Sequence, residues 1–259
     1  MEKDELIEKI MERRQFSGIP RSDVEKAFEK FDRERYSDEE KVKLTRDFLR
    51  TTFSGFSGKK LLASKNKNPE EILQKHLSTR ERYGLYESLY SRILKDLPQD
   101  ITVVDLGAGV NGLSYDSFGR AGKKVHYLGI EAIRQIVELV ENYFKAAKKD
   151  GKILQLSIFE LDKLKKIIQE TRKPRVIFLF KVIDSLEKAE RDFSKKLLKE
   201  IMPLADRVII SFATESWMRR RKFHVTRKWL IDFIRENWNF IDDFELGGER
   251  YLVITREQI

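Results

Sequence analysis

The feature that most constrains this chain is a short apolar run followed at once by a glycine-rich turn. Residues 101–104 are Ile-Thr-Val-Val, Asp105 closes the strand pattern, and residues 107–112 are Gly-Ala-Gly-Val-Asn-Gly. β-Branched residues favour a buried strand, and glycine lets a ligand approach the backbone because it has no Cβ atom. The turn also satisfies the G-x-G-x-x-G pattern. The segment therefore predicts a strand that leads into a binding site for a nucleotide-like cofactor.

Strand and helix patterns alternate from residue 101 onward. The expected strands are 101–105, 125–130, 153–157, 176–181, 207–212, 239–246 and 250–255. Such alternation favours a sheet covered by helices. The last two strands are separated only by Gly-Gly-Glu, too short for a helical crossover, so they predict an antiparallel hairpin at one edge. The predicted fold is α/β, with a Rossmann-like, mostly parallel seven-stranded sheet and a terminal hairpin, an arrangement that resembles the class I methyltransferases.

Residues 1–75 have helical periodicity without strand signals. Leu6 and Ile10, for example, fall on one face of a first helix, and Pro69 can begin a later one. We therefore expect two domains. Residues 1–75 would form a helical N-terminal domain with an RNA-binding or auxiliary role, and residues 76–259 the methyltransferase domain.

Composition limits the chemistry and suggests a partner. A net charge of +9, with 37% charged residues, favours a polyanion such as nucleic acid, although it also suits the surface of a thermophile protein. The absence of cysteine excludes thiolate chemistry, and three histidines make a His-based metal site improbable. There is no apolar run of the roughly 18 residues that span a bilayer, and no signal-peptide core. We expect a cytoplasmic, metal-free monomer.

Two carboxylates flank the glycine turn. Asp105 precedes it, and Glu131 ends the next expected strand. Acidic side chains suit a cofactor with a sulfonium and an amino group, whereas a pyrophosphate prefers helix N-terminal amides. Glu131 can accept both ribose hydroxyls. The structural alternative makes Asp105 a loop-capping residue and Glu131 a solvated strand end.

Arg80 lies upstream in the segment His-Leu-Ser-Thr-Arg-Glu-Arg at residues 76–82. Ser78 and Glu81 have the spacing of a helix capping box, which explains the segment structurally but leaves Arg80 unexplained. A planar guanidinium can hold an α-carboxylate such as that of S-adenosylmethionine.

Four segments together resemble one known family. Residues 76–82 (HLSTRER), 105–112 (DLGAGVNG), 178–187 (FLFKVIDSLE) and 208–216 (VIISFATES) have the order and spacing of the aminoglycoside-resistance-type ribosomal RNA methyltransferases. Those enzymes methylate guanine N7 in the small-subunit decoding region. The resemblance covers about residues 70–255 and is consistent with an archaeal or thermophile-like relative. It implies S-adenosylmethionine as cofactor and small-subunit ribosomal RNA as partner.

The resemblance also implies roles for individual residues. Arg80 would bind the methionine carboxylate, Glu131 the ribose, and Ser157 with Ile158 the adenine, although the family commonly has an Asp at the Ser157 position. The family's Ser-Phe-Pro-x-Lys-Ser is replaced here by SFATES at residues 211–216. The candidate cofactor-binding residues are Arg80, Asp105, Gly107, Ala108, Gly109, Glu131, Ala132, Ser157 and Ile158.

The groups that would meet RNA and the acceptor base follow later strands. Clustered cations interleaved with aromatic residues suit phosphate contacts and base stacking. The candidate RNA-binding residues are Lys59, Lys60, Arg219, Arg220, Arg221 and Lys222, whereas we expect Trp229 in the core. Lys181 and Asp184 are the candidate catalytic residues. Lys181 ends an apolar strand and would orient the base or its phosphate, and Asp184 would accept a proton if the acceptor atom carried one, although a helix-capping role suits it better.

Guanine N7 has a free lone pair, so methyl transfer there needs alignment and no general base. Two other classes of protein are also compatible with the sequence. A nicotinamide-dependent oxidoreductase shares the glycine pattern but leaves Arg80 unexplained, and titration with S-adenosylmethionine and with NAD would separate the two. A non-catalytic RNA-binding or ribosome-assembly factor would bind RNA without transferring a methyl group.

Overall fold

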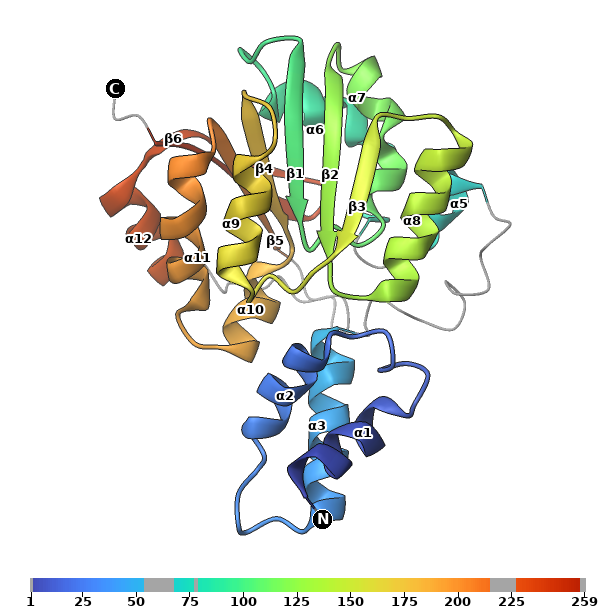
Figure 1. Cartoon of the computed structure of the whole chain (residues 1–259). Helices are drawn as coiled ribbons and strands as arrows, with labels where there is room; N and C mark the ends of the chain where they lie inside the picture. The colour runs from blue at the N-terminus through green and yellow to red at the C-terminus, as the bar shows by residue number, and fades with distance from the viewer. Residues whose placement is uncertain (1, 54–67, 77–78, 215–226, 257–259) are drawn as a thin grey trace.

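A computed structural model describes residues 2–53, 68–76, 79–214 and 227–256 of the chain. Figure 1 shows a small helical unit beneath a larger α/β unit. The helical unit consists of α1 (Lys3–Met11), α2 (Arg21–Glu29) and α3 (Asp38–Thr52). Its core contains the predicted apolar faces and closes around Phe16 and Phe28, both fully buried.

The α/β unit is built on a seven-stranded sheet with the order β3-β2-β1-β4-β5-β7-β6. The strands are β1 (Asp100–Leu106), β2 (Lys124–Glu131), β3 (Gly151–Gln155), β4 (Arg175–Phe180), β5 (Arg207–Ala213), β6 (Asn239–Leu246) and β7 (Glu249–Thr255). The first five are parallel, and β7 pairs antiparallel with both β5 and β6. The predicted sheet and its terminal hairpin are confirmed, with β6 at the edge. Every strand bound lies within two residues of its prediction, because buried parallel strands are continuous apolar runs bounded by turns.

Helices cover both faces of the sheet. Successive side chains of a strand point to opposite faces, so Val103 joins one core cluster and Val104 the other. The first cluster includes residues from α5 (Pro69–Lys75), α6 (Tyr86–Ile93), α7 (Asp116–Arg120) and α8 (Arg134–Ala146). The second includes residues from α9 (Leu161–Gln169), α10 (Ile183–Ala189), α11 (Phe193–Ile201) and α12 (Lys228–Asn237). Short 3₁₀ turns are η2 (Asn111–Ser114) and η3 (Met202–Leu204).

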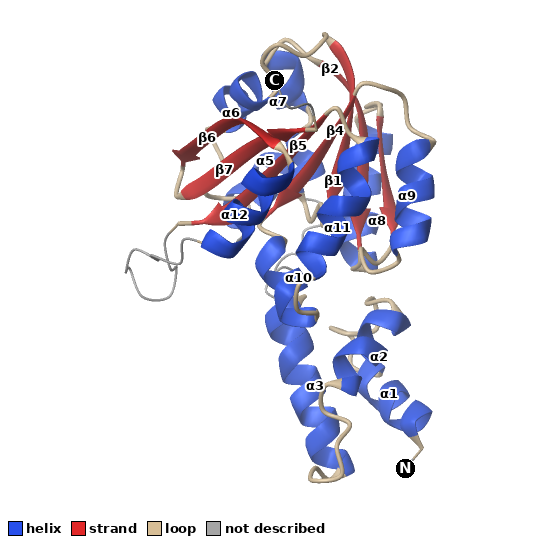
Figure 2. Ribbon diagram, turned by 90° about the vertical axis from the view of Figure 1, so that its left-hand side faces the viewer, coloured by secondary structure: helices blue, strands red, loops and turns tan. Residues whose placement is uncertain are grey.

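The helical unit lies against the carboxyl ends of the parallel strands (Figures 1 and 2). The contact includes backbone hydrogen bonding, since the Gly18 carbonyl accepts from the backbone N–H of Arg134 at 3.0 Å and from Gln155 Nε2 at 3.0 Å. This is the edge at which ligands bind in open α/β sheets, next to the strand where the order reverses. That strand is β1, which pairs with β2 on one side and β4 on the other.

Several local expectations differ from the structure. Trp229, expected in the core, is 38% exposed on α12 beneath the Lys195 ammonium, because the buried face of that helix is formed by Leu230, Ile231 and Ile234. The helix that the capping-box spacing of Ser78 and Glu81 predicts begins only at Tyr86, after Gly84 takes a left-handed φ of +81°. Helix α5, which falls within the segment expected to form the helical domain, contributes Ile72 and Leu73 to the core of the α/β unit.

In the described part of the chain, no helix is both long and apolar enough to cross a membrane.

Candidate cofactor site

A pocket opens at the carboxyl ends of β1, β2 and β4, between the sheet and the helical unit. It offers about 720 Å³ of space, counting the part that is open to solvent. Its described lining is Asp23, Thr52, Phe53, Gly107, Gly109, Glu131, Ala132, Ile133, Ser157, Ile158, Phe159, Lys181, Val182, Ser185 and Leu186. Two of these, Asp23 and Glu131, are buried carboxylates, so the pocket combines apolar walls with negative charge.

The glycine turn forms one wall. Gly107 has a φ of +70°, and a Cβ atom there would lie 2.8 Å from a methyl carbon of Val182. The turn is held by the backbone N–H groups of Gly107 and Ala108, which both donate to the Ile130 carbonyl. Gly107 and Gly109 line the pocket, whereas Ala108 is buried beneath it. Glycine is therefore required at position 107 both for the backbone conformation and for space.

Glu131 lies at the end of β2 and is 8% exposed, so it is not the solvated strand end of the structural alternative. Its carboxylate accepts from the backbone N–H of Gly109 and of Ile133, each at 2.9 Å. Burial raises the pKa of this carboxyl, and the backbone N–H groups oppose the rise. The side chain is held beside the glycine turn, where a carboxylate can accept hydrogen bonds from vicinal hydroxyls.

Ser157 and Ile158 follow β3 and line the same pocket. The Ser157 hydroxyl donates to Asp23 of α2 and accepts from the backbone N–H of Phe159 at 3.2 Å. Asp23 is only 4% exposed, and burial raises its pKa to about 6. The helical unit thus places a carboxylate next to the residue expected to hold adenine.

Asp105 is buried behind the pocket and is not among its described lining residues. Its carboxylate accepts from Asn111 Nδ2 and from the Tyr127 hydroxyl, both at 2.7 Å. Burial raises its pKa to about 6. In this structure Asp105 ties the glycine turn to the strands, as in the loop-capping alternative.

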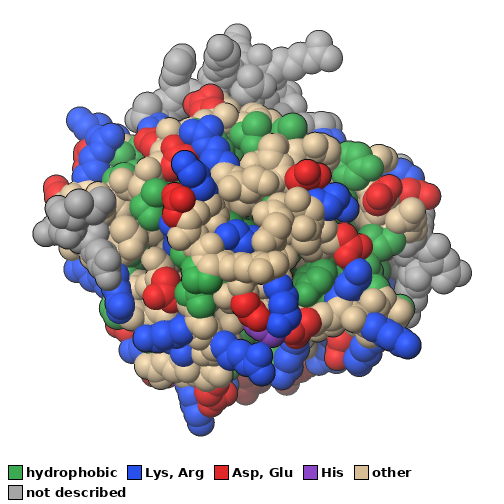
Figure 3. All heavy atoms as spheres, turned by 90° about the horizontal axis from the view of Figure 1, so that it is seen from above, with side chains coloured by type: hydrophobic (Ala, Val, Ile, Leu, Met, Phe, Trp, Pro, Cys, Tyr) green, Lys and Arg blue, Asp and Glu red, His purple; other side chains and the backbone are tan. Residues whose placement is uncertain are grey.

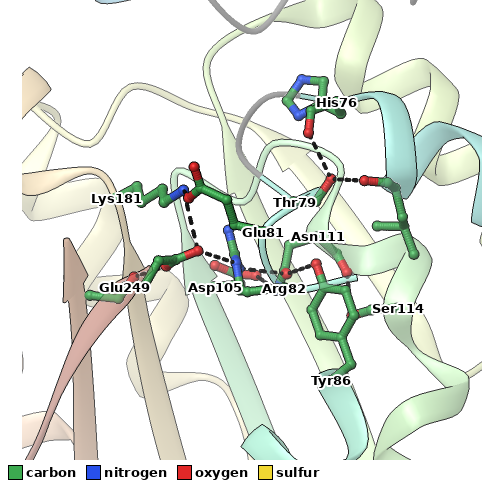
Figure 4. Close-up of polar contacts among 12 residues, drawn as sticks. His76, Thr79, Glu81, Arg82, Tyr86, Asp105, Asn111, Ser114, Lys181 and Glu249 are labelled. Carbon is green, nitrogen blue, oxygen red and sulfur yellow. Dashed lines mark hydrogen bonds and ion pairs between the residues drawn. The ribbon is translucent and has the colours of Figure 1, made fainter. Parts of the chain in front are cut away.

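A buried polar network continues from Asn111 to the far side of β5 (Figure 4). Arg82 donates to Asn111 Oδ1 at 2.9 Å and to Glu249 Oε1 at 3.1 Å. Glu249, fully buried at the start of β7, also accepts from the Ser211 hydroxyl at 2.8 Å. Lys181 reaches the same Glu249 oxygen at 3.3 Å and forms an ion pair with Glu81. The network therefore connects the glycine turn with the part of the pocket lined by Lys181.

Lys181 has the left-handed backbone that favours glycine, with a φ of +56°. Its backbone N–H donates to the Ser211 carbonyl at 3.0 Å, and its side chain is 13% exposed. Backbone strain of this kind persists where the surroundings enforce it, commonly at functional sites. The structure thus places Lys181 in the pocket wall, and its role toward an acceptor base stays a prediction.

Other predicted residues lie elsewhere. Arg80 is half-buried in the turn that precedes α6, and it is not among the described pocket-lining residues. Asp184 is 61% exposed and pairs with Arg227, and Glu187 accepts from backbone N–H groups at the start of α11. The predicted RNA-binding residues Lys59, Lys60 and Arg219 to Lys222, and the Ser78 capping position, lie outside the described residues.

Sequence reasoning missed the part of the pocket supplied by the helical unit. Asp23, Thr52 and Phe53 line it, but nothing local in their segments distinguishes them from ordinary helix residues. Glu81 and Arg82 lie within the segment at residues 76–82, whose capping-box pattern gives no sign of their role in the network. The Gly-Gly-Glu turn predicts the hairpin, but it does not indicate that Glu249 belongs to the network.

The fold and site define a class I methyltransferase. Solved structures share the fold: an rRNA methylase from Escherichia coli has a TM-score of 0.76 at 16% identity and covers 98% of this chain and 99% of that one. The 16S rRNA methyltransferase RmtF, solved with S-adenosyl-L-homocysteine, has a TM-score of 0.77 at 18% identity, over 99% of this chain and 100% of that one.

The family follows from sequence. The model of the ribosomal RNA methyltransferase (FmrO) family matches residues 61–244, more than half of the chain, so the chain belongs to this family. A 16S rRNA (guanine(1405)-N(7))-methyltransferase of Proteus mirabilis is 24% identical over 196 residues, 72% of this chain. The chain spans 64% of the length of that relative. The predicted resemblance is confirmed, and membership removes the nicotinamide alternative.

Proposed function

We propose that this chain transfers a methyl group from S-adenosylmethionine to N7 of a guanine in small-subunit ribosomal RNA. The observation that carries the proposal is the pocket at the carboxyl ends of β1, β2 and β4, in a chain of the FmrO family. The acceptor position is supported by the Proteus mirabilis relative, whose name specifies guanine N7 of 16S rRNA.

The pocket residues fit this cofactor. Gly107 leaves room for close backbone approach, Glu131 offers a buried carboxylate for the ribose hydroxyls, and Ile158 provides an apolar face for a ring. Bound S-adenosylmethionine would supply an electrophilic methyl group on a sulfonium, and the two buried carboxylates of the described pocket lining, Asp23 and Glu131, favour a cationic ligand electrostatically. We assign Ala132 and Ser157 to the same wall. Arg80 stays our proposal for the methionine carboxylate, and Asp105 with Ala108 supports the turn from behind.

The chain's own contribution to the reaction would be alignment. Guanine N7 needs no deprotonation, so no residue has to accept a proton. Asp184, which is exposed and paired with Arg227, is not needed as a base in this scheme. Lys181 is in the wall of the pocket and is held by Glu81 and Glu249, and we propose that it orients the acceptor base or its phosphate.

We propose that the RNA approaches the pocket side of the molecule. The opposite face, at the amino ends of the strands, has basic and acidic side chains interspersed (Figure 3). A net charge of +9 favours a partner that carries phosphates, and this mixed face offers no concentrated positive charge for it. The basic residues Lys59, Lys60 and Arg219 to Lys222, together with the helical unit within residues 1–75, are our candidates for that surface, with residues 76–259 as the methyltransferase domain.

The test uses labelled S-adenosylmethionine with small ribosomal subunits, large subunits and transfer RNA, followed by mapping of the modified position. Label at a guanine N7 of small-subunit RNA is the expected result. Label only in transfer RNA or protein would overturn the substrate assignment. RNA binding without label in any substrate would favour the non-catalytic alternative.

A further inference from the structure

Asp23 is a buried acid whose bonding is incomplete within the described part of the chain. It is 4% exposed, and one carboxylate oxygen, Oδ1, accepts from the Ser157 hydroxyl. The other oxygen, Oδ2, is buried and has no hydrogen-bond partner among the described residues. An unsatisfied buried carboxylate oxygen is destabilising, so such groups usually mark a place where a ligand or water donates.

The position of Asp23 narrows the identity of that donor. Asp23 lines the cofactor pocket and is joined to Ser157, one residue before Ile158. Ile133, Ile158 and Phe159 line the pocket close by and offer apolar surface to a planar ring. Of the two carboxylates in the described lining, Glu131 already accepts from Gly109 and Ile133 beside the glycine turn. Asp23 is therefore the carboxylate available at the Ser157 end.

We propose that Asp23 accepts a hydrogen bond from the exocyclic amine of the cofactor's adenine, so that a residue of the helical unit completes the adenine subsite. The amine has two N–H donors, and the unpartnered oxygen of Asp23 supplies an acceptor. Ser157 is a positioning residue, because its hydroxyl holds the other oxygen of the same carboxylate. This inference rests on the proposed use of S-adenosylmethionine, and it adds a specificity residue that the α/β unit alone lacks.

The charged groups around Asp23 are compatible with this role. Lys26, one turn further along α2, favours the carboxylate, whereas Glu160 and Glu131 oppose its ionisation. Burial dominates these influences. A buried acceptor with a hydrogen bond to one oxygen is already oriented before ligand binding, which lowers the entropy lost on binding.

The experiment measures binding of two ligands by calorimetry, without catalysis. S-adenosylhomocysteine has the 6-amine, and S-inosylhomocysteine has a carbonyl oxygen in its place. The wild-type protein should prefer the amine ligand by about tenfold or more, because a carbonyl would face the Asp23 carboxylate. Asp23→Asn keeps the size of the side chain and can present either an oxygen or an N–H, so the preference should fall by at least about tenfold.

Matched variants separate recognition from folding. Because the preference is a ratio within one protein, it is unaffected by a partial loss of folded material. Asp32→Asn, at an acid of the same helical unit that pairs with Lys41, should keep the wild-type preference. An unchanged preference in Asp23→Asn, or none in the wild type, would overturn the role of Asp23 alone. Failure of the wild type to bind S-adenosylhomocysteine would overturn the proposed function together with this inference.

Discussion

At the scale of single residues, Lys181 is a cation of the pocket wall that contacts two acids. Its ammonium pairs with Glu81 and lies 3.3 Å from Glu249, which is fully buried. Lys181→Ala should lower the single-turnover rate of methyl transfer about tenfold or more, because a preorganised charge beside the acceptor is lost. The dissociation constant for S-adenosylhomocysteine should change less than about threefold by this argument.

Single-turnover assays and calorimetry on the same preparations test this. Lys145→Ala, at an exposed lysine paired with Glu141 on α8, is the matched control and should behave as wild type. A wild-type rate in Lys181→Ala would show that Lys181 has no role in methyl transfer. Equal losses of rate and affinity would instead indicate a collapsed pocket.

The raised pKa of Asp105 leads to a prediction about how the stability of the protein depends on pH. Its pKa is raised from the usual 3.8 to about 6, chiefly by burial. A carboxyl that holds its proton more tightly when folded stabilises the protein below pH 4, and this contribution is lost as pH rises through 6. The change is about 3 kcal/mol in the free energy of unfolding. Asp105→Asn should remove this component, so the stability difference between variant and wild type should change between pH 4 and 7.

Urea unfolding at several pH values measures that difference. Asp23 has a raised pKa of the same size, so the wild-type curve alone is not diagnostic and the comparison with Asp105→Asn is required. Asp162→Asn, an exposed position on α9, serves as control. A difference between Asp105→Asn and wild type that is constant with pH would show that Asp105 does not titrate in this range.

At the scale of elements, the glycine turn after β1 can be tested against a second glycine. Gly107 and Gly122 have φ values of +70° and +74°, but an added Cβ meets Val182 only at Gly107 and nothing within 4 Å at Gly122. Both alanine variants should lose about 1 kcal/mol or more of stability from the strained backbone. Only Gly107→Ala should also weaken S-adenosylhomocysteine binding, by about tenfold or more, because the turn must shift.

Unfolding and calorimetry on the two variants separate backbone strain from steric contact. Equal affinities in Gly107→Ala and wild type would mean that the cofactor does not pack against this turn.

The elements were largely predictable, and the site only partly. Buried strands such as β4 are apolar at nearly every position, which local sequence reveals. The pocket residues that follow β1, β2 and β3 were predictable for the same reason, since carboxyl ends of parallel strands meet at one edge. Trp229 was misplaced because helical periodicity alone did not identify the buried face of α12. Asp23 and Ser157 meet across 134 positions, and such docking leaves no local signal.

At the scale of the whole molecule, the pocket joins the two units of the fold. Thr52 and Phe53 at the end of α3, and Asp23 on α2, line it together with the glycine turn. The units are otherwise connected by contacts such as that between the Gly18 carbonyl and the Arg134 backbone N–H. A ligand that touches both units should therefore stabilise their docking, because undocking would destroy part of its site.

Hydrogen–deuterium exchange measures this coupling. If α2 exchanges through undocking, its exchange should slow by the factor 1 + [L]/Kd, about 100-fold at S-adenosylhomocysteine concentrations of 100 times Kd. Amides of α12, none of whose residues is in the described pocket lining, should be unchanged. Protection of the glycine turn without protection of α2 would show that the cofactor binds the α/β unit alone. Protection of both segments would make the helical unit part of the cofactor site, so RNA contacts made by that unit could alter cofactor affinity.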